Sequence, residues 1–170
     1  MKPIIRQILA PLYYLGERIC VILGEPISVI WASRLDPHRL ALENFGIRVV
    51  APKDYGSRDN HGEVYTALVL LRKFEEERFE VVKEYVHTIF LCGVAFKSGY
   101  MQKSRICYLN VQRFSECPSG TIPITIAGIL VYFATLAKFK KRLWTSEDVK
   151  NICKEEQQRI VDKLSEKLCE

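Results

Sequence analysis

The spacing of the hydrophobic residues changes along the chain between that of strands and that of helices. Ile27–Ala32 and Ile47–Ala51 are short runs with β-branched residues and flanking turn residues, which is typical of buried strands. Between them, Asp36–Pro37 has the form of a helix start and Gly46 that of a helix end. We predict that a helix over Pro37–Phe45 joins the two runs as parallel neighbours in a right-handed βαβ unit.

Three other segments have helical periodicity. Apolar residues recur every three or four positions in Met1–Gly16, in Glu63–His87 and after Ser146, which predicts an amphipathic helix in each place. The polar stretch Lys53–Gly62 is predicted to be a loop. The last helix should bury one stripe of side chains, consisting of Val149, Ile152, Cys153, Ile160, Val161, Leu164 and Leu168.

Two more strands are predicted at Thr88–Phe96 and Arg105–Phe114, joined by a loop around Gly99 and paired antiparallel. A very apolar helix should follow from Pro123 to about Leu143. The predicted fold is a single α/β domain over residues 1–170. Its small mixed sheet has a βαβ core and an antiparallel hairpin, and helices cover it.

The predicted apolar helix belongs to a longer stretch that allows a second interpretation. Cys117–Ala137 contains no charged residue over 21 positions, and the basic run Lys138–Arg142 follows at once. That length could span a bilayer, and the flank fits the positive-inside rule. A central helix that is buried on all sides explains the same pattern without a membrane, and we favour it. Membrane association through residues 117–142 stays as an alternative.

Composition indicates an ordinary globular protein of a reducing compartment. The 170 residues are 48% hydrophobic and 26% charged, which suits one domain with a sizeable core. No two of the six cysteines are spaced C-x-x-C, so we predict free thiols and no metal site. Arg6 interrupts the apolar start and no cleavage site follows, so a secretory signal is not expected. The expected location is therefore cytoplasmic.

The loops after the two predicted parallel strands form the first candidate site. Such strands deliver their following loops to one edge of a sheet, and helix N-termini there attract anions. Arginine can also grip two oxygens of a phosphate at once. The candidate ligand-binding residues are Ser33, Arg34, Lys53 and Arg58.

The same loops carry candidate catalytic groups. A histidine beside an aspartate could act as a general base in phosphoester chemistry. The candidates are His38, His61, Asp54 and Asp59. Spacing alone does not show that the two loops converge, so enzymatic activity is left open and the residues indicate no particular cofactor.

Two other patterns are set aside. Cys107 and Arg113 match the C-x5-R spacing of cysteine phosphatases, but the residues between them are typical of a strand rather than of a glycine-rich phosphate loop. Glu84 and His87 match an E-x-x-H metal motif, but no second copy is present. The face that they share with Glu76 and Glu80 is predicted to be solvated.

The positive charge is concentrated in the C-terminal half. Between Lys97 and Arg142 there are eight basic residues and one acidic residue, Glu116. Such an excess can bind a phosphate backbone, and Phe139 or Trp144 could stack on an unpaired base. The candidate nucleic-acid-binding residues are Lys97, Lys103, Arg105, Arg113, Lys138, Lys140, Lys141 and Arg142.

The leading function is therefore binding of a phosphate-bearing ligand, with DNA or RNA as the first candidate partner, and with phosphoester chemistry in the strand-end loops left open. One alternative is a non-catalytic subunit that binds another protein or a second copy of itself. The other is a membrane-associated protein, which we do not favour.

Overall fold

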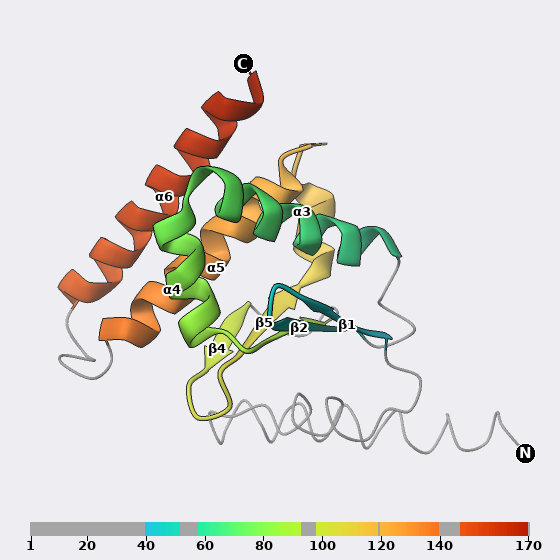
Figure 1. Ribbon diagram of the computed structural model, residues 1–170. Coiled ribbons are helices and arrows are strands. Elements are labelled where there is room, and N and C mark those ends of the chain that lie inside the picture. Colours follow the sequence, from blue (N-terminus) through green and yellow to red (C-terminus); the bar gives the residue numbers. More distant parts are fainter. Residues whose placement is uncertain (1–39, 52–57, 93–97, 119, 140–146, 170) are drawn as a thin grey trace, which may run out of the picture. The chain divides into compact units, whose positions relative to one another are not determined.

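The computed structural model describes five stretches of the chain (Figure 1), namely residues 40–51, 58–92, 98–118, 120–139 and 147–169. The chain divides into two compact units, Met1–Arg39 and Leu40–Glu170, and every described residue lies in the second. The helix predicted over Met1–Gly16 and the strand predicted over Ile27–Ala32 lie outside the described residues. The single domain over 1–170 stays a prediction.

The second unit contains a five-stranded mixed sheet in the order β1-β2-β3-β5-β4. Strands β2, β3 and β5 are parallel, whereas β1 and β4 pair antiparallel with β2 and β5 at the two edges. The bounds are β1 Leu40–Asn44, β2 Ile47–Ala51, β3 Thr88–Cys92, β4 Gly99–Met101 and β5 Ile106–Asn110.

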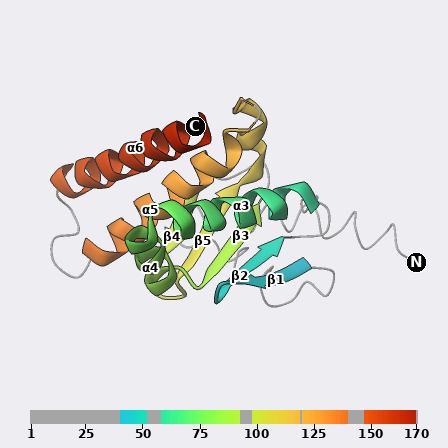
Figure 2. The same ribbon diagram turned by 45° about the horizontal axis from the view of Figure 1, so that its top comes forward.

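Helices lie on one side of this sheet in the second unit (Figure 1). Helix α5 is the middle helix, because it packs against α3, α4 and α6 (Figure 2). The bounds are α3 Arg58–Phe74, α4 Glu76–Tyr85, the 3-10 helix η1 Val111–Glu116, α5 Ile122–Phe139 and α6 Glu147–Cys169. The predicted class is confirmed, since β2, α3, α4 and β3 form a βαβ core and antiparallel hairpins flank it.

The core forms where alternate residues of the parallel strands meet the helices. Val49 of β2, Ile89 of β3 and Leu109 of β5 are fully buried and belong to one cluster with Leu68 of α3 and Leu130 of α5. Hydrophobic side chains at every second strand position produce this face, because successive side chains point to opposite sides of a sheet. On the other face of these strands, Val50 and Phe90 are buried as well, whereas Arg48 is exposed. Burial on both faces explains why the ends of these strands appear as continuous apolar runs.

The helix predicted over Pro37–Phe45 is wrong in its described part, because Leu40–Asn44 is strand β1 of a hairpin with β2. Phe45 and Gly46 form the turn with φ of 55° and 81°, and two central residues at positive φ are what a tight type I′ turn requires. A helix end also favours glycine at positive φ, so Gly46 fits both structures. Because β2 has β1 and β3 as its two neighbours, the predicted pairing of β2 with Ile27–Ala32 is also wrong.

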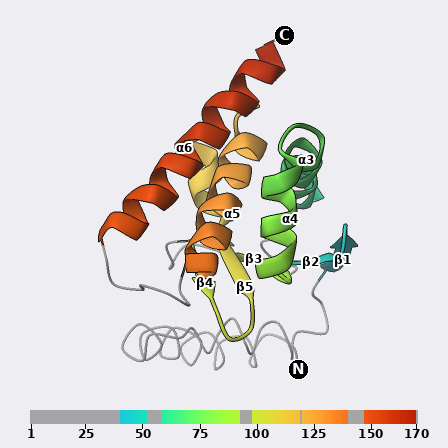
Figure 3. The ribbon, with the colours of Figure 1, turned by 60° about the vertical axis from the view of Figure 1, so that its left-hand side comes forward.

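The predicted loop and long helix over Lys53–His87 are wrong at two points. Helix α3 already begins at Arg58, and the helical region is interrupted at Glu75, where φ is −142° and ψ is 53°. Figure 3 shows α4 turned sharply away from the axis of α3. The turn lets Phe79 and Val82 of α4 enter the same core as α3. The spacing of apolar residues, interpreted as one straight helix, does not reveal such a turn.

The antiparallel pairing predicted for the next two strands is also wrong, because β3 and β5 are parallel. After β3 the chain passes beyond the position of β5, forms the three-residue edge strand β4, and returns through the turn Gln102–Arg105. The hairpin is therefore β4–β5. Strand β5 ends at Asn110, whose side-chain oxygen accepts a hydrogen bond from the backbone of Gln112 (3.0 Å) and starts η1 in place of the predicted strand end.

The predicted apolar helix is confirmed from Ile122 to Phe139, whereas the rest of the prediction, to Leu143, lies outside the described residues. By length and composition this helix could cross a membrane, but 56% of that window is buried inside the protein. Gly128 permits the close approach of α6, because a Cβ atom there would lie 2.8 Å from Cγ2 of Val161. The apolar surface of α5 is thus used by its neighbours in the fold.

Helix α6 lies against α5 and is confirmed from Glu147 to Cys169. Val149, Cys153, Ile160 and Leu164 of its predicted stripe are buried. The expected burial of Ile152 and Leu168 is wrong, since these side chains are 41% and 53% exposed. A straight helix on one neighbour buries a narrow stripe, and both residues lie beside it.

Candidate functional site

The parallel strands β2, β3 and β5 direct their carboxyl ends to one edge of the sheet, which we call the carboxyl edge. This edge is formed by the last residues of the three strands, Ala51, Cys92 and Asn110. From β2, the first of these strands, the chain continues to α3. Ligands of open α/β sheets bind beyond this kind of edge. The prediction had placed its first candidate site at the ends of two parallel strands, and one of those strands, β2, is part of the described edge.

Hydrogen bonds within the protein use most of the polar groups described at this edge. The backbone N–H of Asn110 donates to Oγ of Ser98 (3.1 Å), and the side chain of Asn110 caps η1. The thiol of Cys92 donates to the carbonyl of Leu109 (3.2 Å). These three side chains hold the strand ends and the start of η1 together.

His61 differs from these groups. It lies in the first turns of α3 and is only 4% exposed, yet neither ring nitrogen has a hydrogen-bond partner among the described residues. Desolvation by burial lowers the pKa of His61 below its usual 6.5, so the imidazole is neutral at pH 7. A neutral imidazole offers one N–H donor and one acceptor nitrogen.

The other residues of the first candidate site are only partly placed. Arg58 and Asp59 occupy the first turn of α3 rather than a loop, and their side chains are not described. The remaining five lie outside the described residues, namely Ser33, Arg34, His38, Lys53 and Asp54. The convergence of the two predicted loops on one pocket thus stays a prediction.

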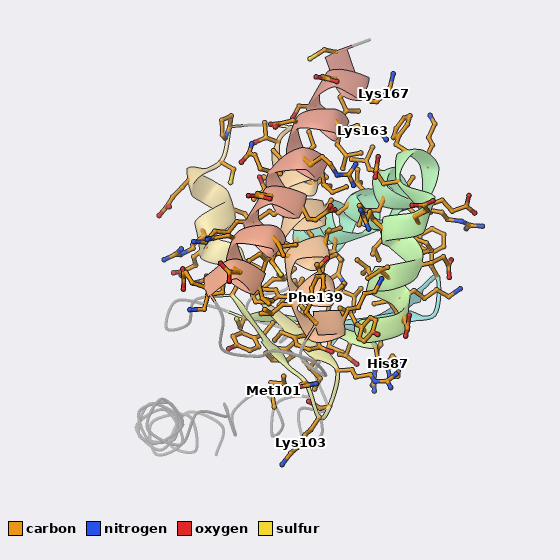
Figure 4. The ribbon with its side chains drawn as sticks, turned by 90° about the vertical axis from the view of Figure 1, so that its left-hand side faces the viewer. His87, Met101, Lys103, Phe139, Lys163 and Lys167 are labelled. Atoms are coloured by element: carbon orange, nitrogen blue, oxygen red, sulfur yellow. The ribbon has the colours of Figure 1, made fainter. Side chains whose placement is uncertain are left out.

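Exposed cations lie at the other end of the parallel strands, opposite the carboxyl edge. Lys103 lies in the turn between β4 and β5, Arg105 precedes β5, and Lys138 is near the end of α5. Figure 4 shows Lys103, His87 and Phe139 toward the same end of the unit, far from Lys163 of α6. We call Lys103, Arg105, Lys138 and His87 the basic end.

Arg105 and His87 are in direct contact at the basic end. The guanidinium lies 2.9 Å from Nε2 of His87 and also donates to the backbone carbonyl of Glu84 (3.3 Å). Because arginine is always a donor, Nε2 must accept this hydrogen bond, which places the imidazole proton on Nδ1.

The predicted basic face is divided by the fold. Arg113 lies on η1, beyond the carboxyl edge, whereas Arg105 lies before β5. At about 3.3 Å per strand residue, the five residues of β5 separate these two arginines by about 16 Å along the strand. The structure therefore does not bring Arg113 together with Lys103. The other four residues of the predicted set lie outside the described residues, namely Lys97, Lys140, Lys141 and Arg142.

The patterns that were set aside are explained by the fold. Cys107 is inside β5 and fully buried, and burial raises the pKa of its thiol, so it cannot serve as a reactive thiolate. The five described cysteines are free thiols, as predicted. Glu76, Glu80, Glu84 and His87 are all exposed, as predicted. Within the described ranges, no group of three metal-ligating side chains could hold an ion.

The sequence had placed His87 only on the solvated face of its helix. Its role beside Arg105 depends on a hydrogen bond across 18 residues of sequence, which no local pattern reports.

Comparison of the chain with models of protein families, with curated proteins and with solved structures found no match.

Proposed function

We propose that this protein binds a phosphate-bearing polymer, with nucleic acid as the leading class, through the basic end. The observation that carries the proposal is a set of exposed cations with no acidic partner among the residues that the structure describes. Within the described part of the chain, no ion pair joins Lys103, Arg105 or Lys138 to a carboxylate. Unpaired cations that share one end of a protein attract a polyanion and release its counterions.

The surroundings of these cations support the same proposal. On α6, by contrast, Arg159 and Lys163 pair with Glu75, and Lys150 pairs with Glu147, so those charges are largely compensated. At the basic end, Arg105 is held by Glu84 and His87 through groups that carry no negative charge. Its guanidinium thus keeps a positive charge that a phosphate can use.

The test is binding of fluorescently labelled single- and double-stranded DNA and RNA, followed by anisotropy at several salt concentrations. Three phosphate contacts predict a salt slope of about −3 on duplex DNA. The double variant Lys103→Glu/Lys138→Glu should weaken binding of every sequence alike and make the slope about two units shallower.

The matched control is Arg113→Glu/Lys154→Glu, which reverses two exposed charges away from the basic end. It changes net charge by the same amount and should retain most of the affinity. Equal losses in the two double variants would mean that net charge alone drives binding, and absence of binding at low salt would contradict the proposal.

A further inference from the structure

A stack of aromatic rings between the β1–β2 turn and α3 ends in an exposed ring. Tyr65 of α3 is 47% exposed and stacks on Phe45, with the ring centroids 5.8 Å apart and the planes 10° from parallel. The Phe45 ring also meets Phe79 of α4 edge-on at 5.8 Å, and the Arg72 guanidinium lies over it at 5.0 Å. Seven helical residues separate Tyr65 and Arg72 by about 10.5 Å, so the Phe45 ring lies between them. Tyr65 is therefore the outer ring of a supported stack.

Phe45 supports this stack from a backbone conformation that bulky residues avoid. Its φ is 55°, in a tight turn where asparagine, aspartate or glycine is the usual residue. Such a conformation persists only where the surrounding packing determines it, and conformations of this kind cluster at binding sites. A ring that is already fixed in place binds a second ring with little further loss of conformational freedom.

The second face of the Tyr65 ring is not covered by its own helix. Long side chains of an α-helix lie over the turn that precedes them. In that turn Gly62 has no side chain, and no atom of the described residues lies within 4 Å of the position that its Cβ would occupy. A planar ligand can therefore stack on Tyr65 without displacing a side chain of this turn.

The amino ends of the parallel strands connect the aromatic stack to the basic end. The turn Phe45–Gly46 precedes β2 just as His87 precedes β3 and Arg105 precedes β5. The backbone N–H of Arg48 donates to the carbonyl of His87 (3.0 Å). Two strand spacings separate β2 from β5, and one ring contact of 5.8 Å leads on to Tyr65, so the path from Arg105 to Tyr65 is about 16 Å. At about 3.4 Å per nucleotide of a stacked strand, this path matches about five nucleotides.

We infer that the partner of the basic end is a single-stranded nucleic acid, and that Tyr65 binds one of its unpaired bases by stacking. This inference rests on the proposed function, because the phosphates of the same strand contact the basic end. A base inside a duplex is already stacked and paired, so only an unpaired base can present its face to Tyr65. A basic surface with an aromatic ring beside it is what proteins use to bind single strands without sequence preference.

The experiment uses the full chain and three labelled probes of about 16 nucleotides, the upper end of common site sizes. The probes are single-stranded oligo-dT, an abasic strand with the same number of phosphates, and the duplex of oligo-dT with oligo-dA. Anisotropy at several salt concentrations gives the Kd and the salt slope of each. We expect the parent chain to bind oligo-dT more tightly than the abasic strand, because only oligo-dT offers bases to the ring.

Tyr65→Ala should weaken binding of oligo-dT about five- to tenfold and leave the Kd of the abasic strand and of the duplex unchanged. The salt slope on oligo-dT should stay the same, because the ring contacts no phosphate. Tyr65→Phe keeps the ring and should bind like the parent. Leu168→Ala is the matched control, since it removes another exposed apolar side chain next to Lys167, at the end of the unit opposite His87 (Figure 4).

Tyr65→Trp gives a readout of stacking that does not depend on affinity. After subtraction of the parent emission, which comes from Trp31 and Trp144, the new indole should be quenched by oligo-dT and not by the abasic strand. If Tyr65→Ala fails to fold, this variant decides the matter, because an unquenched indole would show that no base lies against the ring.

The outcomes separate this inference from the proposed function. Equal affinity of the parent for oligo-dT and the abasic strand would overturn the inference, as would a Tyr65→Ala variant that weakens all three probes alike. Both results leave the phosphate binding of the basic end intact. A parent chain that binds none of the probes at low salt would instead contradict the proposed function, and this inference with it.

Discussion

Glu75, at the break between α3 and α4, forms an ion pair with Lys163 of α6. Its side chain is only 6% exposed, and Arg159 of the same helix approaches it as well, at 3.4 Å. Nearby, Arg78 of α4 pairs with Glu156 of α6 at 3.0 Å. The break in the helical region thus directs a carboxylate to two cations that lie 84 and 88 residues later in the chain. This network joins α6 to the βαβ core.

Replacement of Glu75 by Gln should lower the free energy of unfolding by about 1–3 kcal/mol. The loss should be limited because Lys163 is 46% exposed and can regain water. Urea unfolding measures the change. The control is Glu76→Gln, next in sequence but exposed, which should change stability by less than about 0.5 kcal/mol. Equal effects in the two variants would contradict a specific role for the pair.

A side chain at Gly128 should destabilise the protein, because α5 and α6 lie close together there. A Cβ there would lie 2.8 Å from Cγ2 of Val161 and 3.4 Å from the carbonyl of Gln157, and a backbone atom yields little. Gly128→Ala should cost about 1–3 kcal/mol. Gly62→Ala on α3 meets no atom within 4 Å and should stabilise the protein by about 0.5–1 kcal/mol through helix propensity. Thermal unfolding of both variants compares the two sites, and a stabilised Gly128→Ala would contradict the close packing.

Stability should depend on pH through His61. Its pKa in the folded protein is lowered by burial below 6.5, so the unfolded chain binds a proton that the folded protein rejects. This contribution to stability is fully present above pH 6.5 and is lost as the pH falls through 6.5 toward the folded pKa. Urea midpoints between pH 8 and pH 5 measure it. The fall should be smaller in His61→Leu than in His87→Leu, and identical curves would show that His61 is not desolvated.

Tyr100 should make the protein sensitive to alkaline pH. Burial raises its pKa to about 12, and its hydroxyl donates to the carbonyl of Tyr85 (2.5 Å). The neutral phenol is favoured in the folded state, so this contribution is present below pH 10 and is lost as the pH rises toward 12. Tyr100→Phe should cost about 1 kcal/mol at pH 7 and reduce the alkaline loss. The exposed Tyr65, changed to Phe, is the control, and an equal alkaline loss in both variants would contradict the prediction.

Local sequence patterns were sufficient to predict elements whose structure depends mainly on their own residues. Strand Ile47–Ala51, the apolar helix after Pro123 and the charged helix after Ser146 follow from residue spacing, because periodicity reports which face is buried. The same reasoning failed at Leu40–Asn44, where a glycine at positive φ suits a hairpin as well as a helix end. It failed at Glu75 because the break between α3 and α4 depends on the packing of α4 against the core.

The sequence by itself determined the α/β class, the concentration of cations in the C-terminal half, and the polar residues that precede or begin α3. Only the tertiary structure decided that β3 and β5 are parallel, that Arg105 and Arg113 lie at opposite ends of β5, and that His61 is buried with no hydrogen-bond partner among the described residues. Strand direction depends on where the intervening chain travels, and burial depends on residues distant in sequence. Both are set by contacts between elements, which the spacing within one element does not contain.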